Sequence, residues 1–436
     1  MALKLPANFV SFSYRRTVLP SPSSSHATPS DGPSKAAARL VLRLRQSSPD
    51  SVAATLRRSL RSLPRPALVA TLRYLVHQHE WQLALPMYLS LLDAPWFTWN
   101  AEMHAEIVAL LTSSKQLAQA QHLLESVDEN LSVKQRLYFN RMLIHQYARF
   151  HLRDEVMCVF EYLQALSPSS VGPSSLTSLL HAYAIMDLPH EALAILRKMQ
   201  QQMLNPSLND FKAVLFSLGK CDMFPEMEML AAEMNEVNML NNLAVYNMLI
   251  TTYASAENHG KVKDWLHRLL MAGLNPSVRT LNAIAKACRV LIQVSCSKTF
   301  VKAGVLSEYL RTKGAKDGEL EIVELLLELC PIDEVVTWGS RWELDLHSTN
   351  MESAYILLCC WFEEVSKKLD IKQASPSEIA VVTGWGKHSD TRGLSPIKVM
   401  VRDLLESVKS PFKLDTQNKG RLLAKPHHVV TWFRLL

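Results

Sequence analysis

Apolar residues in the middle of the chain recur with a period of 35 residues. One set that keeps this step is Leu176, Phe211, Tyr246 and Leu281. A second set keeps the same step: Leu179, Val214, Leu249 and Ile284. A fixed period of this length is typical of solenoids, whose units bury their apolar faces only against neighbouring units.

Within each unit the apolar spacing is that of a helix pair. One stripe follows the i, i+3, i+4, i+7 spacing of a helix: Leu176, Leu179, Leu180 and Tyr183. A second stripe begins at Leu193, and Asn205-Pro206-Ser207 returns as Asn275-Pro276-Ser277, where proline can close a hairpin. The pattern predicts an α-solenoid over 66–316. It includes two looser hairpins at 66–100 and 101–135, a slightly longer unit from Tyr138, and a last unit from Thr280 to about Gly314.

The pattern of apolar and polar residues changes from about Val335. The pattern predicts strands at 342–347 and 378–383, helices at 351–369 and 395–408, and two last strands at 420–425 and 428–434. This order, βαβαββ, predicts a small α/β sandwich over 338–436, joined to the solenoid by a linker at 317–337.

Basic charge is concentrated at the amino terminus. The chain has a net charge of +6, yet residues 1–65 carry eleven Lys and Arg against Asp31 and Asp50 only. Arg15 and Arg16 lie among serines and prolines, and no acidic residue occurs before Asp31. This composition is typical of an organelle transit peptide. We therefore expect residues 1–60 to be a disordered transit peptide, which directs the protein to the chloroplast or alternatively to the mitochondrion.

Two other classes of protein are disfavoured. No apolar stretch approaches the roughly 18 residues that a membrane helix needs, so no membrane insertion is expected. The seven cysteines show no CxxC spacing and lie in apolar helical patterns, which favours reduced core thiols over a metal or redox site.

The repeated segment resembles the pentatricopeptide repeat family. The resemblance rests on the 35-residue period, on Val245-Tyr246-Asn247 and Thr280-Leu281-Asn282 at helix starts, and on the Asn-Pro-Ser unit ends. It implies single-stranded RNA as the partner, with one base read per repeat by two side chains. The matching base-reading positions are Asn140, Thr177, Asn247 and Asn282 near helix starts, and Ser207, Asn242 and Ser277 at unit ends. Lys212 departs from this pattern, because lysine discriminates bases poorly.

Charge favours RNA at one end of the solenoid. Residues 258–316 hold eleven Lys and Arg against only Asp264 and Glu308, whereas acidic residues gather at 317–334. The residues expected to contact the RNA backbone are Lys261, Lys263, Arg268, Lys286 and Arg289. A solvated basic face and a helical scaffold that binds protein remain alternatives.

The C-terminal region carries polar residues where α/β proteins place sites. Asp345 and His347 are two residues apart at the end of a predicted strand, so both project from one face. Gly384 and Gly386 follow the next strand, where backbone amides can approach a phosphate.

This region resembles the Small MutS-related (Smr) domain. The matching motifs are Leu344-Asp345-Leu346-His347, Thr383-Gly384-Trp385-Gly386-Lys387-His388, Ser395-Pro396, Ser410-Pro411-Phe412 and Asn418-Lys419-Gly420-Arg421. The resemblance implies nucleic-acid nicking or endonuclease activity, assisted in some members by Mg²⁺ or another divalent cation. Ser348 departs from it, because glycine usually follows the histidine.

A mechanism follows from these residues as a hypothesis. Asp345 would hold a metal ion or orient His347, which would act as general acid or base, with His388 in reserve. The residues expected to bind phosphate and RNA are Gly384, Trp385, Gly386, Lys387 and Arg421.

The sequence thus predicts an organellar RNA-processing protein with an Smr endonuclease. The alternatives are a non-catalytic RNA binder that supports transcript stability, ribosomal RNA maturation or translation, and a protein scaffold. Ribosomal or RNA-processing proteins are further expected partners. His427-His428, expected to begin a strand, and the cluster His77, His79 and Glu80 do not favour a metal site.

Overall fold

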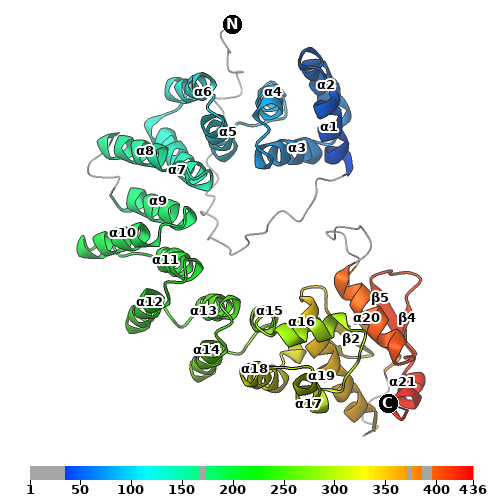
Figure 1. The fold of residues 1–436 in the computed structure, drawn as a ribbon. Coiled ribbons are helices and arrows are strands. Elements are labelled where there is room, and N and C mark those ends of the chain that lie inside the picture. Colours follow the sequence, from blue (N-terminus) through cyan, green and yellow to red (C-terminus); the bar gives the residue numbers. More distant parts are fainter. Residues whose placement is uncertain (1–34, 167–171, 371–375, 385–394, 436) are drawn as a thin grey trace. The chain divides into compact units, whose positions relative to one another are not determined.

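A computed structural model describes residues 35–166, 172–370, 376–384 and 395–435 (Figure 1). The chain divides into two compact units, Met1–Leu230 and Ala231–Leu436. None of the helices in the described ranges combines the length and the apolar character that crossing a bilayer requires.

The first unit consists of helical hairpins. Its helices are α1 (Lys35–Gln46), α2 (Pro49–Ser62), α3 (Arg65–His77), α4 (Trp81–Leu92), α5 (Ala101–Ser113), α6 (Leu117–Asn130), α7 (Val133–Arg149), α8 (Arg153–Leu166), α9 (Gly172–Ile185), α10 (Pro189–Gln201) and α11 (Leu208–Lys220). The unit boundary falls within α12 (Phe224–Glu236). First helices of successive hairpins pack on one another, α5 on α7, α7 on α9 and α9 on α11, so each hairpin buries the face of the one before it.

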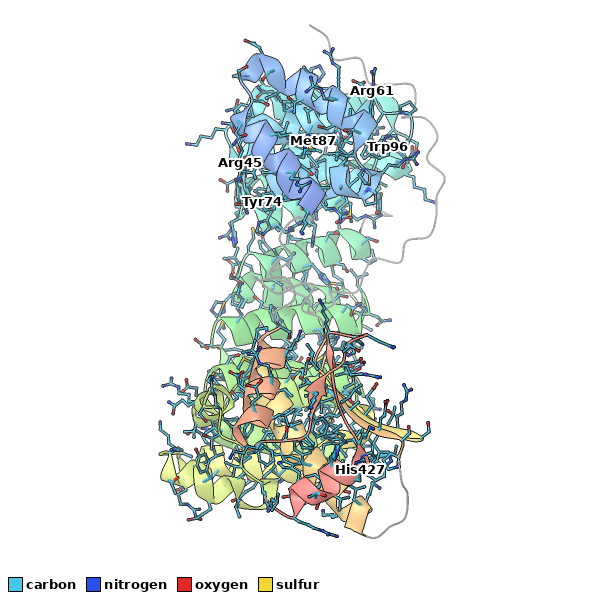
Figure 2. The ribbon with its side chains drawn as sticks, turned by 90° about the vertical axis from the view of Figure 1, so that its right-hand side faces the viewer. Arg45, Arg61, Tyr74, Met87, Trp96 and His427 are labelled. Carbon is cyan, nitrogen blue, oxygen red and sulfur yellow. The ribbon has the colours of Figure 1, made fainter. Side chains whose placement is uncertain are left out.

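The prediction that residues 1–60 are disordered is wrong from Lys35 onward. Helices α1 and α2 bury Leu40, Leu44 and Leu56 and pack on α3 and α4. Arg45 of α1 pairs with Glu80, and its guanidinium lies 6.0 Å from the centre of the Tyr74 ring on α3 (Figure 2). Leu40 and Leu44 in α1, and Val52 and Leu56 in α2, keep the i, i+4 spacing of an amphipathic helix. This spacing was the signal, and the high arginine content of the segment obscured it.

The second unit begins with two more hairpins and ends in a sheet. Its helices are α13 (Leu243–Ser255), α14 (His259–Met271), α15 (Val278–Ala285), α16 (Arg289–Cys296), α17 (Leu306–Thr312), α18 (Asp317–Glu328), α19 (Met351–Asp370), α20 (Pro396–Ser407) and α21 (Pro426–Phe433), with short 3₁₀ turns η2 (Ala303–Val305) and η3 (Ile332–Glu334). Helix α18 and η3 lie within the segment 317–337 that was expected to be a linker, and α18 packs on α14, α15 and α17.

The backbone at the hairpin turns repeats with the sequence. A residue with positive φ, between 52° and 60°, follows the first helix of six successive hairpins: His79, Lys115, His151, Asp187, Asp222 and Glu257. Residues with positive φ also follow three of the second helices: Met203 and Asn238 at 55° and Gly273 at 72°. A left-handed residue just past a helix end satisfies the last carbonyl groups of that helix. The period is therefore a property of the backbone as well as of the apolar core.

The C-terminal sheet has five strands in the order β1-β2-β3-β5-β4. The strands are β1 (Val336–Trp338), β2 (Arg341–Asp345), β3 (Glu378–Val382), β4 (Lys413–Leu414) and β5 (Arg421–Ala424). Strands β2 and β3 are parallel, with Asp345 opposite Val382, and β5 runs antiparallel to β3, with Arg421 opposite Val382. The carboxyl ends of β2 and β3 thus meet the start of β5 at one edge.

The structure contains only part of the predicted element order, βαβαββ. Strand β1, which pairs antiparallel with β2, was not predicted, and the strand expected at 428–434 is wrong, because helix α21 covers that segment. Pro426 starts this helix, and Val429 and Trp432 are buried at a spacing of three residues. His427 and His428 therefore lie in its first turn, with ring centres 4.1 Å apart.

Candidate nucleic-acid interface

The three residues expected to read bases from unit ends are helix N-caps. Ser207 Oγ accepts from the Asp210 amide at 3.4 Å, Asn242 Oδ1 from the Ala244 amide at 2.9 Å, and Ser277 Oγ from the Thr280 amide at 3.3 Å. Capping accounts for small polar residues at these positions without any ligand. An RNA base would have to share side-chain oxygens that already accept hydrogen bonds.

The expected readers near the helix starts differ in exposure. Asn140 is buried in α7, and its Nδ2 donates to the Arg136 carbonyl oxygen at 3.0 Å. Thr177 is half-buried on α9. Asn247 on α13 is half-buried, and its Oδ1 accepts from Thr280 Oγ1 at 2.7 Å, which ties α13 to α15. Lys212 is half-buried on α11.

Asn282 on α15 binds the C-terminal region. Its Nδ2 donates to the Ser348 carbonyl oxygen, its Oδ1 accepts from the Asn350 amide, and its carbonyl oxygen accepts from Asn350 Nδ2, each at 3.0 Å. Asn350 also caps α19 by accepting from the Ser353 amide at 2.8 Å. Asn282 therefore contacts the segment that follows His347.

The expected phosphate-binding cations are partly paired. Lys263 Nζ lies 2.8 Å from Glu321 Oε2, and Arg289 pairs with Glu257. Arg268 lies over the Trp265 ring, 4.5 Å from its centre. Lys261 is half-buried near the start of α14, and Lys286 is exposed at the end of α15. The acidic run at 317–334 thus neutralises part of the basic run before it.

Asp345 and His347 meet at the carboxyl end of β2. Asp345 Oδ1 accepts from the His347 amide at 3.0 Å and lies 2.6 Å from His347 Nδ1. Because an ionised carboxylate can only accept, Nδ1 carries the proton, and Nε2 is the nitrogen left to take or give one. The side chains are 40% and 65% exposed, respectively, so a large ligand can reach both.

Gly384 and Arg421 lie at the same edge of the sheet. Gly384 has a φ of +74°, which glycine adopts without strain, and a Cβ built there would lie in ordinary contact with His347 Cβ at 3.5 Å. Arg421 is 18% exposed and donates to Asp415 Oδ2 at 3.2 Å and to Glu343 Oε2 at 3.3 Å. Its expected role as a free phosphate ligand is therefore limited by two carboxylates that were not singled out in the sequence.

Four of the expected site residues, Trp385, Gly386, Lys387 and His388, lie outside the described residues. In the ranges that are described, no cluster of three or more His, Cys, Asp or Glu side chains is arranged to hold a metal ion. Asp345 is thus the one expected metal ligand whose position is described, and one of its oxygens already binds His347.

Sequence reasoning did not single out Asn350 or Glu334. Asn350 precedes an apolar helical run and has a backbone partner at Ser353, the spacing of an N-cap, which was the available signal. Glu334 Oε2 accepts from the Val278 amide at 2.9 Å and so caps α15 from a residue 56 positions later, which no local pattern indicates.

Comparison with known families identifies the repeats. The "pentatricopeptide repeat domain" matches residues 229–289, and the "PPR repeat" matches residues 174–203. These two segments are therefore similar to pentatricopeptide repeats. These matches cover most of α9 and α10, and the segment from the middle of α12 to the first residue of α16, where the 35-residue period is clearest in the sequence.

Known proteins with pentatricopeptide repeats are similar over more of the chain. Pentatricopeptide repeat-containing protein At2g17033 of Arabidopsis thaliana is 28% identical over 364 residues, which is 82% of this chain and 72% of that protein. Pentatricopeptide repeat-containing protein At3g53170 of the same plant is 24% identical over 48% of this chain and 46% of its own length.

Solved structures of a maize pentatricopeptide repeat protein, PPR10, are similar at low identity. Its crystal structure matches 86% of this chain and 53% of its own chain, with 15% identity and a TM-score of 0.34. Its complex with an 18-nt psaJ RNA element matches 76% and 56%, with 16% identity and a TM-score of 0.24. This chain spans about half the length of PPR10.

Proposed function

We propose that this chain is a chloroplast single-stranded RNA-binding protein that acts in RNA processing, and that its C-terminal region is an Smr-like endonuclease. The observation that carries the proposal is the Asp345–His347 pair at 2.6 Å, exposed at the end of β2 in the same unit as the last pentatricopeptide repeats. Pentatricopeptide repeats bind RNA with one base per repeat. In this proposal the repeats bind the RNA substrate, and the Asp345–His347 pair catalyses its cleavage.

The chemistry uses the free nitrogen of His347. Asp345 holds Nδ1–H, which orients the ring and stabilises the imidazolium that forms when Nε2 takes a proton. Nε2 would accept the proton of the attacking hydroxyl and later return it to the leaving oxygen. The positive φ of Gly384 places backbone beside His347 without a side chain in the way, where a phosphate can approach.

One residue of this site fits a divalent cation. Mg²⁺ is commonly bound through one or two carboxylates plus substrate phosphate and water, and Asp345 Oδ2 is the oxygen not used by His347. A bound cation would neutralise charge that develops on the phosphate.

The full chain, incubated with total chloroplast RNA with and without Mg²⁺, tests the proposal. We expect discrete fragments from the wild type, and a rate about 10²–10⁴-fold lower for the Asp345→Ala/His347→Ala double variant, which removes both the base and its partner. The double variant should still bind RNA. Specific binding by the wild type without cleavage would favour the non-catalytic RNA binder instead, and neither binding nor cleavage would favour the scaffold.

The basic residues of the last repeats test RNA binding separately. Replacing Lys261, Lys263 and Lys286 with alanine should weaken RNA binding and reduce its salt dependence. In a plot of the logarithm of the RNA-binding constant against the logarithm of salt concentration, the slope should become less steep by about 0.7 for each lost lysine that contacts a phosphate of single-stranded RNA. Lys367→Ala, an exposed lysine on α19 paired with Glu364, is the matched control. An unchanged slope in the triple variant would contradict this path for the RNA.

We also propose that the organelle address lies within residues 1–34, since α1 and α2 belong to the folded first unit. A fluorescent protein that carries residues 1–34 should enter chloroplasts. Entry into mitochondria would support the alternative organelle, and a cytosolic signal would contradict the address.

A further inference from the structure

The hydrogen-bonding capacity of Asn282 is largely used. An asparagine reads a base edge by donating from Nδ2 and accepting at Oδ1 together. In α15 the first group already binds the Ser348 carbonyl oxygen, and the second already binds the Asn350 amide. A base that bound through these same two groups would leave the backbone groups of Ser348 and Asn350 without partners, which is costly when a polar group has no replacement. The second N–H and the second lone pair of the amide are held in the orientation that the Ser348–Asn350 segment imposes.

Asn247, one repeat earlier, is the informative comparison. It occupies the same position 35 residues before Asn282, and among the described residues its side chain has one hydrogen-bond partner, Thr280 Oγ1, which donates to its Oδ1. Its Nδ2 can still donate to a base. The two asparagines look equivalent in sequence, and their contacts separate them.

Other contacts join the last repeat to the C-terminal region. Helices α15 and α16 both pack on α19. The Glu334 carboxylate caps α15 at Val278, and Tyr355 of α19 donates from its hydroxyl to the Thr299 carbonyl oxygen at 3.1 Å. Asn282 therefore forms part of a packed joint, which Figure 1 shows with α15 and α16 beside α19.

We propose that Asn282 is a positioning residue, which holds the Ser348–Asn350 segment and thereby fixes His347 relative to the last repeat, and that it reads no base. The inference rests on the proposed function of the Asp345–His347 pair. Ser348 directly follows His347, so a displacement of Ser348 is transmitted to the imidazole through one peptide bond. The last base-reading asparagine is then Asn247, and cleavage falls at a fixed number of nucleotides from the base that Asn247 binds.

Hydrogen exchange of the full chain tests the contact without RNA. In Asn282→Ala, amides of residues 346–354 should exchange about tenfold to a hundredfold faster, because the two side-chain bonds of Asn282 to this segment are lost. Asn282→Asp keeps the acceptor for the Asn350 amide and loses the donor to Ser348, so it should give an intermediate rate. Asn275→Ala, an exposed asparagine seven residues earlier, should leave the segment unchanged. Unchanged exchange in Asn282→Ala would overturn the proposal.

Selection from randomised RNA tests the base-reading alternative. We expect Asn282→Ala to keep the base preference of the wild type at every position, whereas Asn247→Ala should lose it at one. A changed preference at one position in Asn282→Ala would show that Asn282 reads a base and would overturn the proposal.

Mapping of fragment ends tests positioning itself. The wild type should cut at one distance from the selected sequence, and Asn282→Ala should spread the cuts over neighbouring phosphates, with partial restoration by Asn282→Asp. An unchanged single cut site in Asn282→Ala would overturn the positioning role. If the wild type binds RNA but does not cut, the proposed activity fails, and the exchange and selection results alone decide the role of Asn282.

Discussion

Lowering the pH from 7.5 to 5.0 is expected to destabilise the first unit by about 2 kcal/mol through one side chain, His104. His104 is fully buried on α5. Its Nδ1 accepts from Trp99 Nε1 at 3.2 Å and lies 2.7 Å from the Tyr88 hydroxyl, and its Nε2 lies 3.2 Å from the Leu123 carbonyl oxygen. The indole can only donate and the carbonyl can only accept, so the ring is neutral with its proton on Nε2, and the lone pair of Nδ1 faces both the indole N–H and the Tyr88 hydroxyl.

Protonation of this ring is unfavourable in the folded state. Burial lowers the pKa of His104 from 6.5 to about 4. The unfolded chain therefore binds a proton at a higher pH than the folded chain does. Stability from this residue is fully present above pH 6.5 and is lost as the pH falls towards 4, at about 1.4 kcal/mol per pH unit.

Urea unfolding of the wild type and His104→Gln at both pH values measures this effect. The glutamine variant should be less stable at pH 7.5, because it cannot reproduce the geometry of all three partners. Its further loss at pH 5.0 should be smaller than that of the wild type by about 2 kcal/mol. Equal losses in the two proteins would show that His104 does not titrate in this window.

Replacing Trp361 with alanine is expected to destabilise the second unit by about 3–5 kcal/mol. Trp361 is fully buried on α19, with its ring centre 5.3 Å from that of Phe362 and 6.4 Å from that of Phe412. Helix α19 packs on α15, α16, α18, α20 and α21, so a cavity there loosens both the last repeat and the helices beside the sheet.

Trp361→Phe separates packing from hydrogen bonding. The buried Nε1 has no acceptor among the described residues, and an unsatisfied buried N–H costs about 1–3 kcal/mol. Phenylalanine removes that group and keeps a ring, so it should cost far less than alanine in a thermal unfolding measurement. A loss for phenylalanine as large as that for alanine would mean that the N–H has a partner, such as a bound water.

The repeats could be predicted because their physics is local. The apolar stripe from Leu176 to Tyr183 fixes which face of α9 is buried, and the 35-residue step carries this information to the next hairpins. Helices α1 and α2 were missed because arginine-rich composition suggested an address, although a solvated helix face has the same composition. Helix α21 was read as a strand because a short apolar run satisfies both periods.

The candidate site depends on contacts that sequence does not encode locally. Asp345 ends β2 and His347 lies in the turn that follows, so the pair joins residues only two positions apart and a local pattern could indicate it. The partners of Asn282 lie 66 and 68 residues away, and Arg421 meets Glu343 across 78 residues. These distances explain why Asn282 and Asn247 received the same predicted role although their surroundings differ.

The shortened last hairpin has a consequence for how such chains can grow. Helices α15 and α16 have eight residues each, against thirteen in α13 and α14, and α15 lacks the left-handed residue that ends α13. A 35-residue unit duplicated upstream of α15 would meet standard helix faces on both sides and leave the joint with α19 untouched. A unit inserted after α15 would break the joint. Repeat number can therefore change during evolution or engineering while the C-terminal region keeps its distance from the final repeat.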